Sequence, residues 1–284
     1  MKYIKKFENN AAYQAYADSA EYVEPHVSLS VEENEVHFNK VVEAPFKWKA
    51  TYLDGHVESA ETGTTSIANN EIPDKANLVK VEIGDTVASI GNYVFSGSTS
   101  LTSVKMPDTL TSIGSGTFYN CSGLTSVSLP SALTSLGSFA FYGCGVTSIT
   151  IPNGITSIAR GAFQKCGLTK VNSNVEGECN LPNGISGLYR DAFNGCTGFT
   201  TVILPSTVTR LGEDNDLDGF GQSFYGCTNL VSVTCLATTA PVLASRHRMD
   251  FDNTNGCPLY CPADSINSYK STWSEYASRI LPIV

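Results

Sequence analysis

An internal repeat constrains this chain of 284 residues more than any other feature. The motif Leu-Thr-Ser-Val-x-apolar-Pro stands at Leu101–Pro107 and Leu124–Pro130, and returns in altered form at Val146–Pro152 and Phe199–Pro205. A phenylalanine ends each unit, first at intervals of 22 or 23 residues and then of 30 and 31. These phenylalanines are Phe95, Phe118, Phe141, Phe163, Phe193 and Phe224.

The pattern inside one unit predicts a coil with a short strand. Leu-x-x-Val-x-apolar alternates as a half-buried strand does, with its apolar side chains on one face. The proline that follows cannot donate to a ladder, so it ends the strand and turns the chain. One unit cannot bury its apolar stripe alone, whereas stacked units can, with equivalent strands about 4.8 Å apart. We therefore expect a solenoid.

The units resemble a known repeat family. The stretch Arg160–Leu168, Arg-Gly-Ala-Phe-Gln-Lys-Cys-Gly-Leu, is similar to the BspA-type leucine-rich repeat, and the resemblance covers about residues 78–236. It implies a β-rich leucine-rich-repeat solenoid of short stacked strands, with turns or short helical segments. It also implies a bacterial surface or secreted protein, since some family members act as adhesins that bind host matrix proteins.

Three domains are expected. Residues 76–257 hold about seven repeat units, with insertions near 172–180 and 213–222. Residues 1–75 do not repeat and predict a small α+β module, with a short helix considered at residues 10–19 and a hairpin turn signal at Asp54-Gly55. This module either caps the array or is a separate attachment unit.

Residues 258–284 predict a C-terminal cap with a helix. Asp264 is the expected N-cap residue. The apolar residues that follow are spaced by three or four, so we expect one helical face that covers the last coil. Those residues are Ile266, Tyr269, Trp273, Tyr276 and Ile280.

The charge disfavours two classes of partner. With a formal net charge of −9 and a pI near 4.9, the surface repels phosphate backbones and anionic lipids. We expect no nucleic-acid partner and no membrane insertion, because no window approaches the roughly 20 apolar residues of a membrane span. The first ten residues show no signal-peptide pattern, so the sequence leaves the location open, as it does the oligomeric state.

Five of the nine cysteines follow the repeat phenylalanine by three residues. Free cysteine behaves as a small buried hydrophobe, so a buried thiol ladder is the plainest interpretation, although the spacing leaves disulfides open. Cys257 and Cys261 have no second Cys or His pair nearby, so a zinc site is not expected and a strand at Leu259–Cys261 is.

The second insertion contains a candidate calcium ligand set. Asp214, Asp216 and Asp218 alternate and are followed by Gly219, as in the first half of a calcium-binding loop. The twelfth position, where a bidentate Glu belongs, is Tyr225. A solvated acidic loop is the competing interpretation, and no other cofactor is expected.

No catalytic pattern is present. The four histidines are scattered, and a Ser or Cys nucleophile needs a positioned base. No glycine-rich phosphate loop follows a strand and opens a helix. We therefore expect a protein that is not an enzyme.

Two rows of outward strand positions are the candidate binding face. Both are mostly small and hydroxylic, which also suits plain soluble sheet surface. One row is Glu82, Lys105, Ser128, Thr150, Asn172, Ile203 and Thr234. The other is Lys80, Ser103, Ser126, Ser148, Lys170, Thr201 and Ser232.

The expected function is a non-enzymatic, adhesin-like module that binds a protein or a glycan through this sheet face and the two insertions. The alternative is a structural or assembly component docked through its N-terminal module.

Overall fold

The computed structural model describes residues 26–32, 35–42, 45–213, 222–243, 251, 254 and 256–284. The chain divides into two compact units, Met1–Pro45 and Phe46–Val284, so the expected boundary at residue 75 falls inside the second unit. In the first unit, β1 (His26–Glu32) and β2 (Glu35–Val42) form an antiparallel pair. The helix considered for residues 10–19 lies outside the described residues.

The second unit begins with a hairpin that covers the first coil. β3 (Phe46–Tyr52) and β4 (Val57–Glu61) are antiparallel and turn at Asp54-Gly55, as the sequence predicts. β3 also pairs antiparallel with β6 (Leu78–Ile83), the first repeat strand, and buries Trp48 and Tyr52 against the core. Because the hairpin reverses strand direction, it ends the parallel array at this side.

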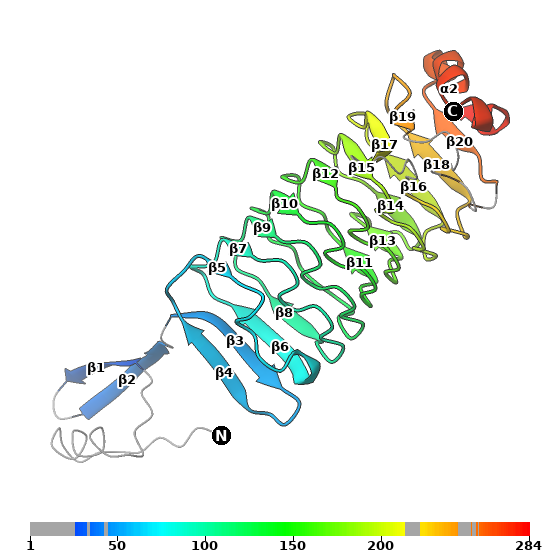
Figure 1. The fold of residues 1–284 in the computed structure, drawn as a ribbon. Helices are drawn as coiled ribbons and strands as arrows, with labels where there is room; N and C mark the ends of the chain where they lie inside the picture. The colour runs from blue at the N-terminus through cyan, green and yellow to red at the C-terminus, as the bar shows by residue number, and fades with distance from the viewer. Residues whose placement is uncertain are drawn as a thin grey trace. The chain divides into compact units, whose positions relative to one another are not determined.

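The first strand of each coil builds one parallel ladder (Figure 1). β6 pairs with β8 (Ser103–Lys105). At the next unit only a bridge between Ser126 and Ser148 is formed. The ladder then continues through β11 (Ser148–Ile149), β13 (Lys170–Val171), β14 (Glu178–Asn180), β16 (Thr201–Leu204), β18 (Ser232–Cys235), β20 (Leu259–Cys261) and β21 (Ile280–Pro282).

The second strand of each coil builds another parallel ladder. It consists of two four-stranded sheets, which carry the Ser-Ile or Ser-Leu step of the repeat. One sheet holds β5 (Ser66–Ile67), β7 (Ser89–Ile90), β9 (Ser112–Ile113) and β10 (Ser135–Leu136). The other holds β12 (Ser157–Ile158), β15 (Gly187–Tyr189), β17 (Arg210–Glu213) and β19 (Val242–Leu243).

The repeat phenylalanines stack inside the coils. Their rings are nearly parallel, with centroids 5.1–6.0 Å apart, and all are fully buried. The stack contains one ring that the repeat spacing did not identify, Phe251. It therefore runs through Phe95, Phe118, Phe141, Phe163, Phe193, Phe224 and Phe251.

The cysteines form the expected buried ladder, and all nine are free thiols. Each repeat cysteine donates its S–H to the carbonyl of the phenylalanine one coil earlier, as Cys121 does to Phe95 and Cys144 to Phe118 at about 3 Å. The same bond recurs at Cys166, Cys196 and Cys227. The thiol therefore fills the core and adds a second hydrogen bond to a carbonyl that already accepts the backbone N–H three residues further along its own turn.

The first insertion adds a strand to one ladder only. β14 lies between β13 and β16 in the first ladder, with Cys179 paired to Val171 on one side and to Val202 on the other. In the second ladder, β12 pairs directly with β15. The eight or so extra residues are thus a short loop that returns the chain to the same sheet.

The C-terminal segment caps the last coil, but it is less helical than predicted. α2 covers only Ile266–Thr272 and begins after η2 (Ala263–Ser265), so Ser265, not Asp264, is the N-cap residue. η3 (Ser274–Arg279) follows, and Ile280 belongs to strand β21. The predicted face is nonetheless buried: Tyr269 donates its hydroxyl to the Ala237 carbonyl at 2.7 Å.

Candidate binding surfaces

The outward row predicted on the first ladder is present, with corrections. Lys105 pairs with Glu82 across neighbouring strands, and both side chains reach solvent. Thr150 is exposed, and Ser128 is exposed within the stretch where the ladder is interrupted. Ile203 and Thr234 are partly exposed and lie side by side on β16 and β18.

Asn172 does not belong to this row. It has a left-handed backbone (φ 48°), and its side-chain amide holds both the N–H and the C=O of Ile151 at 2.9 and 3.0 Å. The insertion shifts the register, so Asn180 takes the place beside Ile203. The sequence signals this shift through the interval of 30 residues between Phe163 and Phe193. The extra residues leave both Asn172 and Asn180 as candidates for the same position in the row.

Lys170 is on the ladder, where it aligns with Ser148 in the second predicted row. Its ammonium lies 3.0 Å from the Glu176 carboxylate of the inserted loop. Here too the insertion adds a member, since Glu178 aligns with Thr201. The first ladder therefore offers a hydrophilic sheet with opposite charges side by side.

Many hydroxyl groups beside the strands have a structural task. Thr102 donates to the Val79 carbonyl and Thr134 to the Thr111 carbonyl, in each case one coil earlier. Each of these carbonyls also accepts the backbone N–H of the same threonine, so the hydroxyl adds a second hydrogen bond between neighbouring coils. The repeated threonine of the Leu-Thr-Ser motif is thus explained by the fold, without a ligand.

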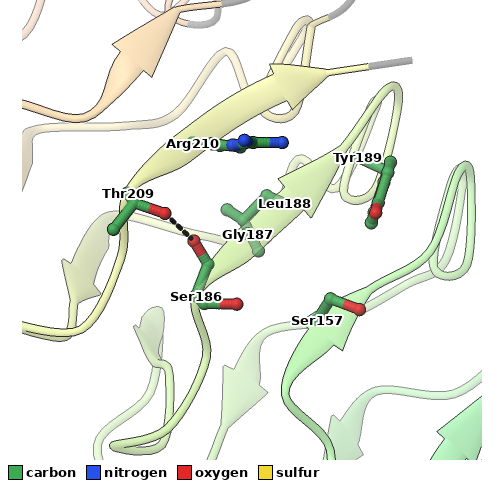
Figure 2. Close-up of a pocket in the computed structure, with 7 residues that line it drawn as sticks. All are labelled: Ser157, Ser186, Gly187, Leu188, Tyr189, Thr209 and Arg210. Atoms are coloured by element: carbon green, nitrogen blue, oxygen red, sulfur yellow. Dashed lines mark hydrogen bonds between the residues drawn. The ribbon is translucent and has the colours of Figure 1, made fainter. Parts of the chain in front are cut away.

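The second ladder carries a hollow that the sequence did not predict. Its outward row is Ser66, Ser89, Ser112, Ser135 and Ser157, followed by Gly187, Arg210 and Val242. A Cβ placed on Gly187 would have no heavy atom within 4 Å. The missing side chain leaves a recess of about 250 Å³ (Figure 2).

Polar groups line this recess. Ser157 and Tyr189 border it on β12 and β15, and Arg210 borders it on β17. Ser186 and Thr209 also line it; Thr209 donates its hydroxyl to the Ser186 carbonyl at 3.0 Å. The recess therefore combines a guanidinium, an aromatic ring and hydroxyl oxygens, which suits one polar group such as a sugar ring or a single side chain.

One feature of the sequence points to this recess, although the spacing of the repeats does not reveal it. Glycine replaces serine at one place in an otherwise regular outward row. Gly187 is not at a positive φ, so its backbone does not require glycine. The strand that follows in the ladder, β17, leads directly into the second insertion.

Metal and nucleophile chemistry has little support in the described part of the chain. There, no three His, Cys, Asp or Glu side chains gather closely enough to hold a metal ion. Asp214, Asp216 and Asp218 lie outside it, so calcium binding stays a prediction; Asn at all three positions should abolish any calcium-dependent rise in melting temperature. Burial raises the pKa of the Cys166 thiol to about 12, which disfavours the nucleophilic thiolate.

Within the part of the chain that the structure describes, every helix is too short or too polar to span a lipid bilayer.

Comparisons with known proteins give one family and several similar folds. The profile "BspA type Leucine rich repeat region" matches residues 65–177 and 172–235 in six copies. No curated protein matches the chain.

Similar solved structures are leucine-rich-repeat proteins and a bacterial antigen. A leucine-rich repeat protein from Bacteroides ovatus is 17% identical, with 93% of this chain and 82% of that chain covered and a TM-score of 0.35. A T. pallidum leucine-rich repeat protein is 24% identical, with 61% and 67% covered and a TM-score of 0.36. The pneumococcal vaccine antigen PcpA is 16% identical, with 73% and 68% covered and a TM-score of 0.33.

The matched repeats span more than half of the chain and coincide with the stacked coils of the second unit. The chain belongs to the BspA-type leucine-rich repeat family.

Proposed function

We propose that this chain is a non-enzymatic binding module that recognises a protein or glycan ligand on its solenoid faces, in the manner of an adhesin. The recess around Gly187 carries the proposal. It interrupts a regular serine row, it joins Arg210 and Tyr189 at one place, and nothing in the folding of β15 requires glycine there. A feature that folding does not explain is a candidate for recognition.

The size of the recess limits what it holds. Ligand pockets for drug-sized molecules start at roughly 300 Å³, so a recess of about 250 Å³ fits one monosaccharide or one side chain. The rest of the contact would come from the neighbouring sheet surface and from the second insertion, into which β17 leads. Recognition would thus combine one anchored group with a broad polar surface.

The test fills the recess without disturbing the coil. Gly187→Phe places a ring where a Cβ meets no neighbour, and Ser112→Phe places the same ring at the equivalent position three coils earlier. Binding of each variant to immobilised fibronectin, laminin and collagen, and to a glycan array, is compared with that of the parent chain. We expect loss of binding for Gly187→Phe alone.

An equal loss in both variants would assign recognition elsewhere on the ladder, and no binding by the parent chain to any of these probes would refute the proposal. Gly187→Ser restores the serine of the regular row. It is expected to fold like the parent and to bind more weakly.

A second candidate function is attachment of the chain to a larger assembly through its N-terminal unit. Residues Met1–Pro45 form a compact unit of their own, with the hairpin β1–β2. Because Phe46–Glu61 already covers the first coil, the preceding residues are not needed for that purpose. Removal of residues 1–45 should release the protein from its assembly if this candidate is right; unchanged localisation would exclude it.

A further inference from the structure

The third side of each coil, between the second strand and the repeat phenylalanine, has its own backbone ladder. The N–H groups of Tyr93, Gly116 and Phe139 donate to carbonyls of the next coil at 2.8–2.9 Å, and Gly161 does the same. All four residues have a positive φ, between 56° and 58°. They are therefore equivalent positions in four successive coils.

Aromatic residues and glycines alternate at this position. The ring of Tyr93 covers Gly116, where an added Cβ would lie 2.3 Å from its Cε1 atom. The ring of Phe139 covers Gly161 in the same way, with 2.4 Å to its Cδ1 and Cε1 atoms. Each ring thus needs a glycine in the following coil.

The aromatic residues are costly choices for folding. A bulky residue at positive φ is an outlier, whereas glycine adopts this conformation freely. Such conformations persist where the surrounding structure enforces them, and they cluster at functional sites. Tyr93 is also 47% exposed, so its ring does little for the core.

Two more rings extend the same surface. Tyr119 and Tyr142 stack at 4.6 Å with nearly parallel planes, and Phe139 meets Tyr142 edge to face at 6.1 Å. We call Tyr93, Tyr119, Phe139 and Tyr142 the aromatic edge.

Cations accompany the aromatic edge. The Lys75 ammonium donates to the Tyr93 carbonyl at 3.0 Å, and the Arg160 guanidinium lies 5.6 Å from the centre of the Phe139 ring. Lys165 lies at the same distance from the ring of Tyr142. The cations beside Phe139 and Tyr142 favour a ligand that is both stacked and anionic, and their local charge acts against the repulsion from a chain with a net charge of −9.

We propose that the aromatic edge binds an extended acidic polysaccharide of the hyaluronan type. Tyr93 and Phe139 are two coils apart, which is ~9.6 Å at the usual strand spacing of ~4.8 Å. This is close to the length of one disaccharide in an extended β-linked glycan. Hyaluronan presents one carboxylate and apolar sugar-ring faces in each such repeat, which suits two rings spaced two coils apart with the cations Arg160 and Lys165 beside the second.

This site is separate from the recess around Gly187, and neither proposal depends on the other. Its residues belong to coils that contain none of the recess residues except Ser157, which precedes Arg160.

The experiment measures binding of a hyaluronan decasaccharide to the full chain by isothermal titration calorimetry. Tyr93→Gly and Phe139→Gly remove the rings and relieve the left-handed backbone, so both variants should fold. We expect each to weaken binding about tenfold, the scale of one aromatic contact, and the double variant to weaken it further. The matched control is Asn120→Gly, an exposed residue at φ 57°, which should bind like the parent.

Two further comparisons test the charge. Arg160→Gln should weaken hyaluronan binding, and raising the ionic strength from about 0.01 M to about 1 M should do the same because it shortens the Debye length to ~3 Å. Cellohexaose has a similar extended backbone without carboxylates and should bind more weakly.

Three results would overturn the proposal: no hyaluronan binding by the parent, unchanged binding by the double variant, or cellohexaose binding as tight as that of hyaluronan. Gly187→Phe should leave hyaluronan binding unchanged, which keeps the two proposals distinguishable.

Discussion

The phenylalanine stack should provide much of the cohesion between coils, and Phe141 tests this. Phe141 is fully buried and lies between Phe118 at 5.1 Å and Phe163 at 5.7 Å. Truncating a buried phenylalanine to alanine costs about 3–5 kcal/mol. Each lost aromatic pair accounts for about 0.5–1.5 kcal/mol, so the loss of two pairs places Phe141→Ala toward the upper part of that range.

The chain contains suitable reporters for this experiment. Its only two tryptophans are Trp48, in the hairpin on the first coil, and Trp273, in the C-terminal cap. Urea unfolding followed by fluorescence in Trp48→Phe and Trp273→Phe backgrounds therefore reports on the two ends separately. In a repeat array each coil contacts mainly its neighbours, so weakening a central coil should make the two ends unfold at different urea concentrations.

Two comparisons sharpen the result. Phe141→Leu fills most of the space but loses both ring pairs, so it should cost about 1–3 kcal/mol, less than Phe141→Ala. Tyr142→Ala, in the same coil but partly exposed, loses its ring contacts with Tyr119 and Phe139 and should cost about 1–2 kcal/mol, less than Phe141→Ala. If Phe141→Ala lowers the free energy of unfolding by less than about 1 kcal/mol with coincident transitions at both ends, the stack is not what holds the coils together.

Three further predictions concern single residues. Gly116→Ala should destabilise the fold by about 1–3 kcal/mol, because φ is +58° and the new Cβ meets the Tyr93 ring; denaturant unfolding should show a smaller cost in a Tyr93→Gly background. Burial raises the pKa of Cys166 and Cys227 to about 12 from a usual 9.0, so the unfolded chain loses these protons first as the pH rises. Their contribution to stability should be complete below about pH 9 and fall above it by about 1.4 kcal/mol per thiol per pH unit, measured by urea unfolding across pH; a flat profile would contradict their burial. Asn172→Ala should cost about 1–3 kcal/mol in thermal or urea unfolding, since two backbone groups of Ile151 lose their partner, and a neutral result would show that water replaces the amide.

The repeat spacing was sufficient to predict the architecture. Each unit has a strand of period two followed by a proline, and a phenylalanine recurs every 22–23 residues. A solenoid is the arrangement that buries the apolar stripe of every such unit. The cysteine ladder followed from the same reasoning, because a small apolar side chain beside a buried ring belongs in the core.

The errors have physical causes. The row assignment of Asn172 was wrong because an insertion inside a strand-to-proline step changes the register, and spacing alone does not say which side of the loop continues the row. Ile280 has helical spacing from Tyr276 but pairs with Leu259 on β20, since tertiary pairing overrides a short local pattern. Phe251 was missed because it stands 27 residues after Phe224, without the regular flanking motif.

Neither candidate site followed from the sequence pattern. The recess depends on a glycine whose meaning appears only when eight outward residues are aligned across the ladder. Recognising the aromatic edge requires the backbone conformation, because the amino-acid sequence does not show that Tyr93 and Gly116 both adopt a left-handed backbone.

The alternation of ring and glycine bears on how such arrays change length in evolution. Loss or duplication of one coil between Tyr93 and Gly161 would set two rings, or two glycines, at adjacent left-handed positions. With two adjacent rings, the Cβ of the second aromatic residue would lie 2.3–2.4 Å from atoms of the first ring. With two adjacent glycines, the backbone of the second glycine would have no ring packed over it. Loss or gain of two coils together keeps every ring above a glycine. In this stretch the pair of coils, and not the single repeat, is the unit that duplication and deletion can use.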